Sequence, residues 1–159
     1  MNSSPQYQAP LRSFDSRKKA LDSLFKMAES VTDEPLKNEL ARYICIRISG
    51  LIEQTVVSFY NQYAYAKGHP NLSRYISRSI KLQNPGMKKL IDLSRNFNEK
   101  WAVELDALDD SIKSAVDSIV AIRNHVAHGK DRGVRLSKVS DYYQKILQLL
   151  ATIQKQCEL

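Results

Sequence analysis

Glycine, proline and cysteine are scarce in this sequence: its 159 residues include five glycines, five prolines and two cysteines. So few helix-breaking residues leave long stretches in which apolar side chains recur with the ~3.6-residue period of an α-helix. The two cysteines, Cys45 and Cys157, are far apart and form no Cys-x-x-Cys pair. We therefore expect reduced thiols, with Cys45 packed in the core. A chain of this length can fold without disulfides or a structural metal.

Long hydrophobic runs are also missing. The first 13 residues contain no apolar segment that resembles the core of a signal peptide. The richest apolar stretch, from Tyr43 to Tyr60, is interrupted by Arg47 and Glu53, which leaves it well short of the ~20 clean residues that a membrane span requires. These absences predict a cytoplasmic protein with no membrane partner.

Acidic residues are absent from one long segment. Between Gln54 and Ile91 there are six basic residues and no acidic one, whereas six acidic residues lie between Glu99 and Asp117. A second basic cluster follows, made up of Arg123, Lys130, Arg132, Arg135 and Lys138. The net charge is +7. Segregated positive charge indicates a polyanionic partner such as nucleic acid or, equally well, solvated helix faces.

The periodicity predicts an all-α, up-and-down helical bundle, with residues 1–13 as a flexible tail and residues 14–159 as a single domain. Asp33-Glu34-Pro35 is typical of a helix start, and the helix that follows is long enough to form the spine of the bundle. Asn84-Pro85-Gly86 predicts a turn, and Trp101 is expected to anchor a connection to the core. The expected helices span 14–28, 34–67, a short segment after 71, 87–97, 110–128 and 137–157.

The expected helix from Asp110 to His128 carries an anomaly. At ~100° per residue its apolar side chains gather on one arc, and Arg123 lies near the middle of that arc. An unpaired guanidinium in an apolar stripe costs on the order of several kcal/mol. Arg123 must therefore face a carboxylate on a neighbouring helix, an open cleft or an interface.

Polar residues crowd the last turn and a half of this helix, where Arg123, Asn124, His125 and His128 precede Gly129. Histidine exchanges protons near neutral pH and arginine binds phosphate through two parallel hydrogen bonds, so together they suit phosphodiester cleavage. On a straight helix, however, Arg123 and His128 are about 140° apart. Either the last turn unwinds at Gly129, or a second copy of the helix supplies the other half of the site. We favour a second copy related by a two-fold axis.

The segment Arg123-Asn124-His125-Val126-Ala127-His128-Gly129 resembles the Arg-x4-6-His motif of the HEPN superfamily, including the polar residue after the arginine. The motif lies near the end of the penultimate long helix. Together with Ile48-Ser49-Gly50-Leu51-Ile52-Glu53 on the spine and Phe97-Asn98-Glu99-Lys100-Trp101, this arrangement is similar to the RiboL-PSP-HEPN branch. The resemblance covers roughly residues 36–153.

The resemblance implies a HEPN-like bundle that forms a homodimer and cleaves RNA at a composite cleft without a metal or other cofactor. Arg123 would hold the scissile phosphate, His128 would act as general acid/base for attack by the RNA 2′-hydroxyl, and Asn124 would orient these groups. Glu53 matches an acidic position near the cleft and would be an accessory residue. Arg47 is a second anomaly of the sequence itself, because it shares a stripe with Leu40, Ile44 and Leu51 on the spine, and we expect it either to pair internally or to line the cleft.

Relatives of this kind also suggest a toxin-antitoxin or phage-defence setting, with an antitoxin or other regulatory protein as partner. Some HEPN toxins carry, two residues after the histidine, a tyrosine that a nucleotidyltransferase modifies. That position is Lys130 here, so silencing by that route is not supported.

Three alternatives remain open. His125 and His128 have the spacing of a metal pair, although His69 is the only other histidine. Tyr60, Tyr63 and Tyr65 could stack on bases, although such residues more often pack in a core. The chain could also be a non-catalytic HEPN module that binds RNA, a nucleotide or a partner protein.

Overall fold

The computed structural model describes residues 5–129 and 133–159, with side chains described from residue 9 onward. Within these residues the chain is all helical, as the periodicity predicts. The seven helices are α1 (Pro5–Glu29), α2 (Glu34–Lys67), α3 (Pro70–Ser79), α4 (Met87–Phe97), α5 (Glu99–Asp106), α6 (Asp110–Ala127) and α7 (Leu136–Gln156).

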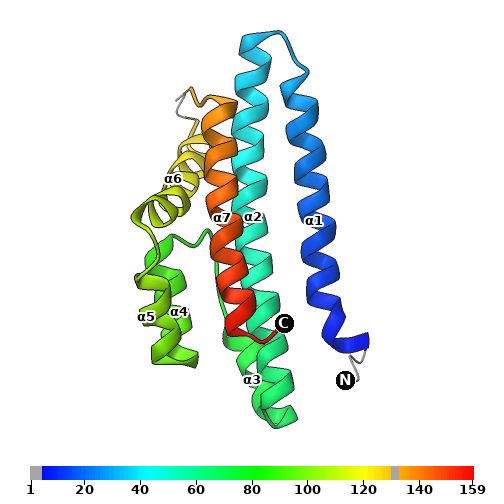
Figure 1. The fold of residues 1–159 in the computed structure, drawn as a ribbon, viewed down its shortest axis with the longest axis vertical. Helices are drawn as coiled ribbons and strands as arrows, with labels where there is room; N and C mark the ends of the chain where they lie inside the picture. Colours follow the sequence, from blue (N-terminus) through cyan, green and yellow to red (C-terminus); the bar gives the residue numbers. More distant parts are fainter. Residues whose placement is uncertain (1–4, 130–132) are drawn as a thin grey trace.

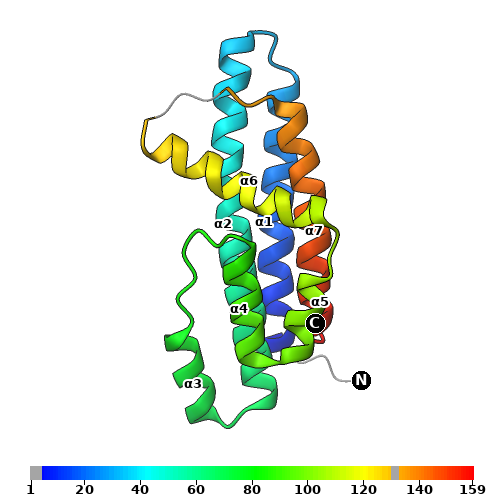
Figure 2. The ribbon, with the colours of Figure 1, turned by 90° about the vertical axis from the view of Figure 1, so that its left-hand side faces the viewer.

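Three long helices, α1, α2 and α7, run side by side and form the body of the bundle (Figure 1). The shorter helices α4 and α5 pack on each other beside the lower half of this body, and α3 folds back on the end of α2. The remaining helix, α6, crosses α2 and α7 at a steep angle (Figure 2). The C-terminal half of α6 therefore extends beyond the body of the bundle.

The spine helix α2 begins and ends where the sequence predicts. The Asp33 carboxylate accepts a hydrogen bond from the Leu36 backbone N–H at 2.8 Å, and Pro35 lies in the first turn. At the other end, the Gly68 N–H donates to the Ala64 carbonyl at 2.8 Å, and a Cβ on residue 68 would lie 2.7 Å from that oxygen. Glycine is thus required there because the chain turns tightly against the helix end.

The first helix is longer than predicted: it begins at Pro5 instead of Phe14. Pro10 is buried, and Leu11 and Phe14 pack against the core. The Phe14 ring meets Phe59 edge-on, with 6.0 Å between centroids. Burial of these side chains extends the helix into a segment whose composition alone is typical of a polar tail.

The connection after Phe97 is a further helix, α5, in place of the expected connecting segment. The Asn98 side chain caps it by accepting from the Lys100 N–H at 2.9 Å. Trp101 on α5 contacts Tyr63 edge-on, with 4.9 Å between ring centroids. The expected anchoring role of Trp101 is confirmed, but a capped helix carries it.

The core lies along α2 and α7. On α7 the apolar stripe of Val139, Tyr143, Ile146, Leu150 and Ile153 is buried throughout. Cys45 and Cys157 are both unpaired and buried, and burial raises the pKa of each thiol to about 12. None of the described helices combines the length and apolarity needed to cross a membrane.

Candidate active site

The helix that carries the Arg-His motif changes its environment halfway along. Asp109 caps its start by accepting from the Ser111 N–H at 2.8 Å, and the helix begins at Asp110 as predicted. Its fully buried residues, Ile112, Ala115, Val116 and Ile119, all lie in the first ten positions. From Val120 to Ala127 every side chain is half-buried or exposed, because this half of α6 extends beyond α2 (Figure 2). The motif therefore lies at the free end of a helix whose base is fixed in the core.

The end of α6 is regular. The His128 N–H donates to the Asn124 carbonyl at 3.1 Å, and the Gly129 N–H donates to the Val126 carbonyl at 3.1 Å. Gly129 has φ +65°, a left-handed conformation that favours glycine. This agrees with the predicted role of Gly129 at the end of the helix.

Arg123 is half-buried and has no carboxylate within ion-pair distance in residues 5–129 and 133–159. One guanidinium nitrogen, Nη1, donates to Asn124 Oδ1 at 3.5 Å. The described residues thus give no support to the internal salt bridge that was one explanation of the anomaly. The guanidinium remains available to an anion or an interface.

Asn124 is held by Asn84, a residue that the sequence places in a turn and does not mark as part of the site. Asn84 Nδ2 donates to Asn124 Oδ1 at 2.7 Å. Asn84 is itself held by α2, because Ser49 Oγ donates to Asn84 Oδ1 at 2.9 Å and the Asn84 N–H donates to Glu53 Oε2 at 3.0 Å. Residues from the spine, the α3–α4 loop and α6 therefore form one connected network.

These bonds fix which end of the Asn124 amide faces outward. The Ser49 hydroxyl donates a hydrogen bond to the carbonyl oxygen of the Asn84 side chain. Because this oxygen faces Ser49, the NH2 group of Asn84 faces Asn124. Asn124 Oδ1 then accepts from both Asn84 and Arg123. Its own NH2 group has no acceptor among the described residues, so Asn124 offers two N–H donors beside the Arg123 guanidinium. Both residues consequently present donors suited to an anionic oxygen.

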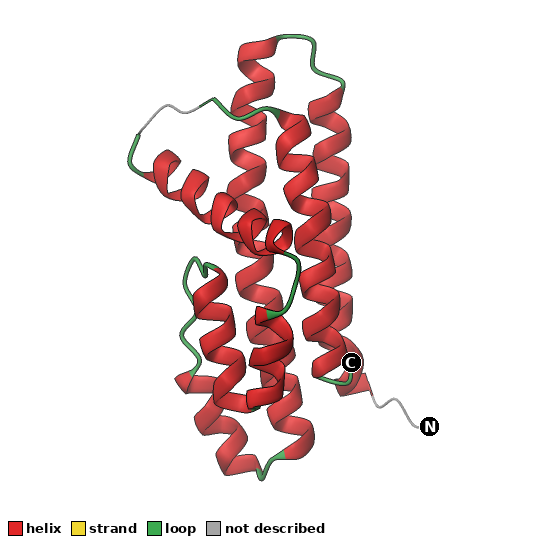
Figure 3. Cartoon of the chain, turned by 60° about the vertical axis from the view of Figure 1, so that its left-hand side comes forward, coloured by secondary structure: helices red, strands yellow, loops and turns green. Residues whose placement is uncertain are grey.

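A second contact anchors the same loop to α6. Asp117 Oδ1 accepts from the Met87 N–H at 2.8 Å, and a Cβ on Gly86 would approach the same oxygen to 2.9 Å. Asp117 and Asn124 are seven residues apart, about two helical turns. The apex of the α3–α4 loop accordingly lies beneath α6 (Figures 2 and 3). The predicted turn at Asn84-Pro85-Gly86 is thus present, and the loop that contains it is hydrogen-bonded to the part of α6 that carries the Arg-His motif.

Glu53 is half-buried and joins this network by accepting a hydrogen bond from the backbone N–H of Asn84. Arg47 lies on a different face of α2. Its Nη1 donates to the Tyr43 hydroxyl at 3.0 Å, and it lines a groove of about 260 Å³ with Arg17 and Leu21 of α1. Arg47 thus faces α1, and Glu53 faces the loop that contacts Asn124.

The two histidines of the motif differ in exposure: His125 is half-buried and His128 is exposed. Neither imidazole is hydrogen-bonded to a described residue, and no hydrogen bond joins His128 to Arg123. The last turn of α6 does not unwind before Ala127. The side chains of Arg123, Asn124 and Asn84 are therefore connected within one chain and reach Glu53 through the Asn84 N–H, whereas the His128 imidazole has no hydrogen bond to any of them.

No three His, Cys, Asp or Glu side chains form a cluster suited to a metal ion in the described part of the chain. Tyr60 is buried and stacks on Phe97 at 4.6 Å, and Tyr63 packs against Trp101. Packing is therefore confirmed for these two tyrosines, whereas Tyr65 is exposed. Lys130 and Arg132 of the second basic cluster lie outside the described residues.

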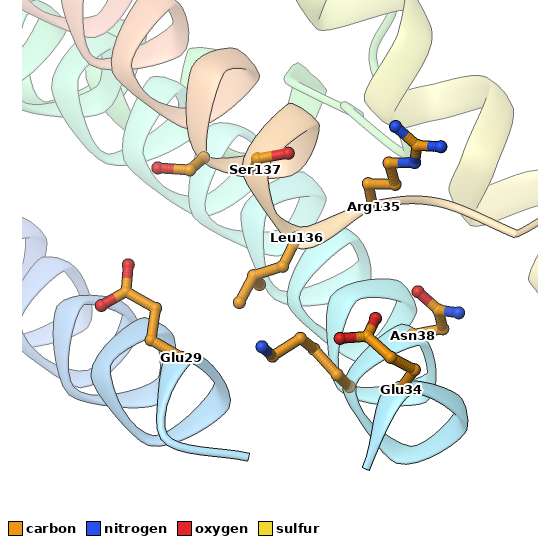
Figure 4. A pocket seen from close by; sticks show the side chains of 8 residues that line it. Glu29, Glu34, Asn38, Arg135, Leu136 and Ser137 are labelled. Atoms are coloured by element: carbon orange, nitrogen blue, oxygen red, sulfur yellow. The ribbon is translucent and has the colours of Figure 1, made fainter. Parts of the chain in front are cut away.

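Two further hollows lie near α7. One, of about 760 Å³, runs between Ile122 of α6 and Lys138 and Tyr142 of α7, beside the motif. The other, of about 600 Å³, lies at the α1–α2 turn and has mixed charge (Figure 4). In that pocket Leu136 points between Glu29 and Glu34, and the guanidinium of Arg135 points away from both carboxylates. No residue of the Arg-His motif lines this second pocket.

An all-α bundle with an Arg-x4-His motif at the end of its penultimate helix has the features of a HEPN domain. The model of the family RiboL-PSP-HEPN matches residues 12–159, so the chain belongs to this family. No curated protein and no solved structure matches the chain.

Proposed function

We propose that this protein is a metal-independent endoribonuclease that acts as a homodimer and needs no cofactor. The observation that carries the proposal is the arrangement of Arg123 and Asn124. A half-buried guanidinium without a carboxylate partner among the described residues lies beside an amide whose NH2 group is turned outward. Such a pair can bind a phosphodiester, and family membership adds the expectation of RNA as substrate.

In this proposal the second copy supplies His128. Arg123 of one copy binds two non-bridging oxygens of the scissile phosphate, and an Asn124 N–H donates to one of them. His128 of the other copy accepts the proton of the 2′-hydroxyl as the 2′-oxygen attacks phosphorus. The bond to the 5′-oxygen breaks, and the imidazolium gives its proton to that oxygen. The products are a 2′,3′-cyclic phosphate, which water can open to a 3′-phosphate, and a 5′-hydroxyl.

The exposed half of α6 supports a two-fold dimer. Val120, Ile122 and Val126 are only half-buried on this part of the helix, and apolar side chains at such an end gain stability when a second copy covers them. A two-fold axis near this face would bring the motif of each copy toward the other. As part of the same proposal, the enzyme acts in the cytoplasm as a toxin or phage-defence effector, restrained by an antitoxin or other regulatory protein.

A second candidate is a non-catalytic HEPN module that binds RNA, a nucleotide or a partner protein. The observation that favours it is the exposed imidazole of His128, which no described residue orients. General acid/base catalysis usually requires a fixed tautomer and geometry. A binding module needs Arg123 and Asn124 but has no such requirement for His128.

Cleavage of mixed RNA by the purified protein in excess EDTA separates the two candidates. The nuclease predicts cutting by the wild type, with cyclic phosphate or 3′-phosphate ends and 5′-hydroxyl ends. It also predicts a loss of about 100-fold or more in Arg123→Ala and in His128→Ala. His125→Ala is the matched control, because it removes a neighbouring imidazole that has no role in the mechanism. RNA binding without cutting, unaffected by His128→Ala, would favour the binding module.

A further inference from the structure

The outer surface of α3 carries unusually exposed apolar residues. Leu72 is 61% exposed and Tyr75 is 71% exposed, the two highest values among the exposed large hydrophobic side chains. Among the described helices, α3 packs only against α2. The opposite side of α3 faces solvent, so Tyr75 is available to a ligand.

A groove of about 700 Å³ separates α3 from α4 and extends along the loop that joins them. Its apolar lining comes from Ile76, Ile80, Leu82, Leu93 and Phe97, and Tyr75 lies on the α3 side. Lys81 and Lys89 also line it. The groove thus combines an aromatic ring, apolar surface and two ammonium groups.

The charge of this region favours an anionic ligand. The segment from Gln54 to Ile91 contains six basic residues and no acidic one. The carboxylate in the groove, Asp92, pairs with Lys88 at 2.7 Å and with Arg95 at 3.1 Å. The hydrogen bond from Lys88 is the main reason that the pKa of Asp92 is lowered, so Asp92 stays ionised and its charge is offset by its two partners. Lys81 has no ion-pair partner among the described residues.

The groove also adjoins the candidate active site. Lys81 is three residues from Asn84 in the same loop, a separation of at most ~11 Å along the chain. Asn84 in turn donates to Asn124 beside Arg123. Figures 2 and 3 show this loop rising from α3 to an apex beneath α6. A flexible polyanion bound at Arg123 can therefore continue past Asn84 into the groove.

We propose that the α3–α4 groove binds the single-stranded RNA that flanks the scissile phosphate. Tyr75 stacks on a base, and Lys81 and Lys89 contact backbone phosphates. This inference rests on the proposed function, since it names a binding site for the same substrate. Single-stranded RNA fits better than an acidic helix for two reasons. The groove combines the exposed Tyr75 ring with the ammonium groups of Lys81 and Lys89, and the loop that borders it leads to the proposed phosphodiester site at Arg123.

The first test measures binding of a fluorescent, unstructured 12-nucleotide RNA to the full chain carrying His128→Ala, which prevents cleavage. Adding Tyr75→Ala is expected to weaken binding about tenfold, and adding Tyr75→Phe to leave it unchanged, because the ring provides the stacking. Tyr65→Ala is the control, as it removes an exposed tyrosine that does not line the groove. Equal affinity of the Tyr75→Ala and Tyr75→Phe variants would overturn the proposal.

The second test uses salt. Removing both lysines, in Lys81→Ala/Lys89→Ala, is expected to make the slope of log affinity against log salt shallower by about 1.4, since each phosphate contact on a single strand contributes about 0.7. Lys19→Ala/Lys155→Ala removes the same charge from exposed positions on α1 and α7 and is expected to keep the slope. Equal slopes in the two double variants would contradict phosphate contacts in the groove.

A third test identifies the contact directly and separates this proposal from the proposed function. RNA that contains 5-iodouridine is expected to crosslink to Tyr75, as located by mass spectrometry. If the wild type cuts RNA but Tyr75→Ala binds and cuts the 12-mer normally, the groove proposal fails and the nuclease stands. If Tyr75 crosslinks and governs binding but nothing is cut, the nuclease fails and the groove stands. A change in oligomeric mass in Tyr75→Ala, without a change in RNA affinity, would assign the groove to a protein contact and overturn the proposal.

Discussion

Asn84 Nδ2 donates to Asn124 Oδ1 at 2.7 Å across 40 positions of sequence. Through this bond, a loop residue determines how the neighbour of Arg123 presents its amide. Ser49 and Glu53 on the spine hold Asn84 in turn. The orientation of a side chain at the exposed end of α6 therefore depends on contacts made by α2, in the body of the bundle.

Asn84→Asp is expected to reverse the Asn124 amide. Aspartate tolerates the φ of 44° at position 84, and its carboxylate can still accept a hydrogen bond from Ser49. Toward Asn124, however, the carboxylate has no N–H to donate and can act only as an acceptor. The Asn124 carbonyl then faces the phosphate, and kcat/KM for RNA is expected to fall about tenfold or more, further than in Asn84→Ala. Gln83→Glu adds the same charge one residue away and is the control. Greater loss in Asn84→Ala than in Asn84→Asp would contradict this account of amide polarity.

Glu53 is expected to act by positioning Asn84. Because the Asn84 N–H needs only an oxygen acceptor, Glu53→Gln is expected to keep most of the cleavage rate and an unchanged pH profile. Glu53→Ala leaves this N–H without its partner, which costs on the order of 1 kcal/mol of loop stability, and is expected to lower kcat. Loss of one limb of the pH–rate profile in Glu53→Gln would instead indicate direct proton transfer by Glu53.

Arg123→Ala is expected to abolish cleavage without destabilising the fold. No described carboxylate pairs with Arg123, so removal of the guanidinium should change the free energy of unfolding by less than about 0.5 kcal/mol. Arg123→Lys keeps the charge but loses the planar two-point contact with phosphate, and is expected to be nearly as inactive. A markedly lower melting temperature for Arg123→Ala would show a structural salt bridge.

The two buried thiols are expected to resist alkylation. Burial raises the pKa of Cys45 and Cys157 from 9.0 to about 12, so both stay protonated in the folded protein at pH 8. In the unfolded chain they ionise above pH 9, so the free energy of unfolding should decrease between about pH 9 and 12. Iodoacetamide labelling with and without denaturant, followed by mass spectrometry, checks this. Rapid labelling of the native protein would contradict it.

Much of the fold could be predicted because it follows from local rules. The caps at Asp33 and Asp109, the break after Lys67 and the apolar stripe of α7 each depend on residues within a few positions of one another. The start of α1 and the whole of α5 were missed, because Phe14 and Trp101 are fixed by contacts with distant residues of α2. Propensity and periodicity carry no information about such contacts.

The residues of the candidate site likewise differ in whether the sequence alone indicates them. Arg123 was identified because a charge within an apolar stripe is anomalous in the sequence itself. Asn84 was not identified, because its role depends on a loop whose folded path brings it to Ser49, Glu53 and Asn124. Its one local signal was an asparagine before Pro85-Gly86, which predicts a turn and says nothing about the partner of its side chain.

Mixing two inactive variants tests most directly the central claim that Arg123 of one copy works with His128 of another. Arg123→Ala and His128→Ala protomers are mixed in equal amounts, unfolded together and refolded. Half of the resulting dimers should be heterodimers, and in each heterodimer one of the two composite sites should have both an intact Arg123 and an intact His128. Cleavage is therefore expected to return to about a quarter of the wild-type rate. No recovery, with heterodimers detected by native mass spectrometry, would contradict the composite site and assign both residues to one chain.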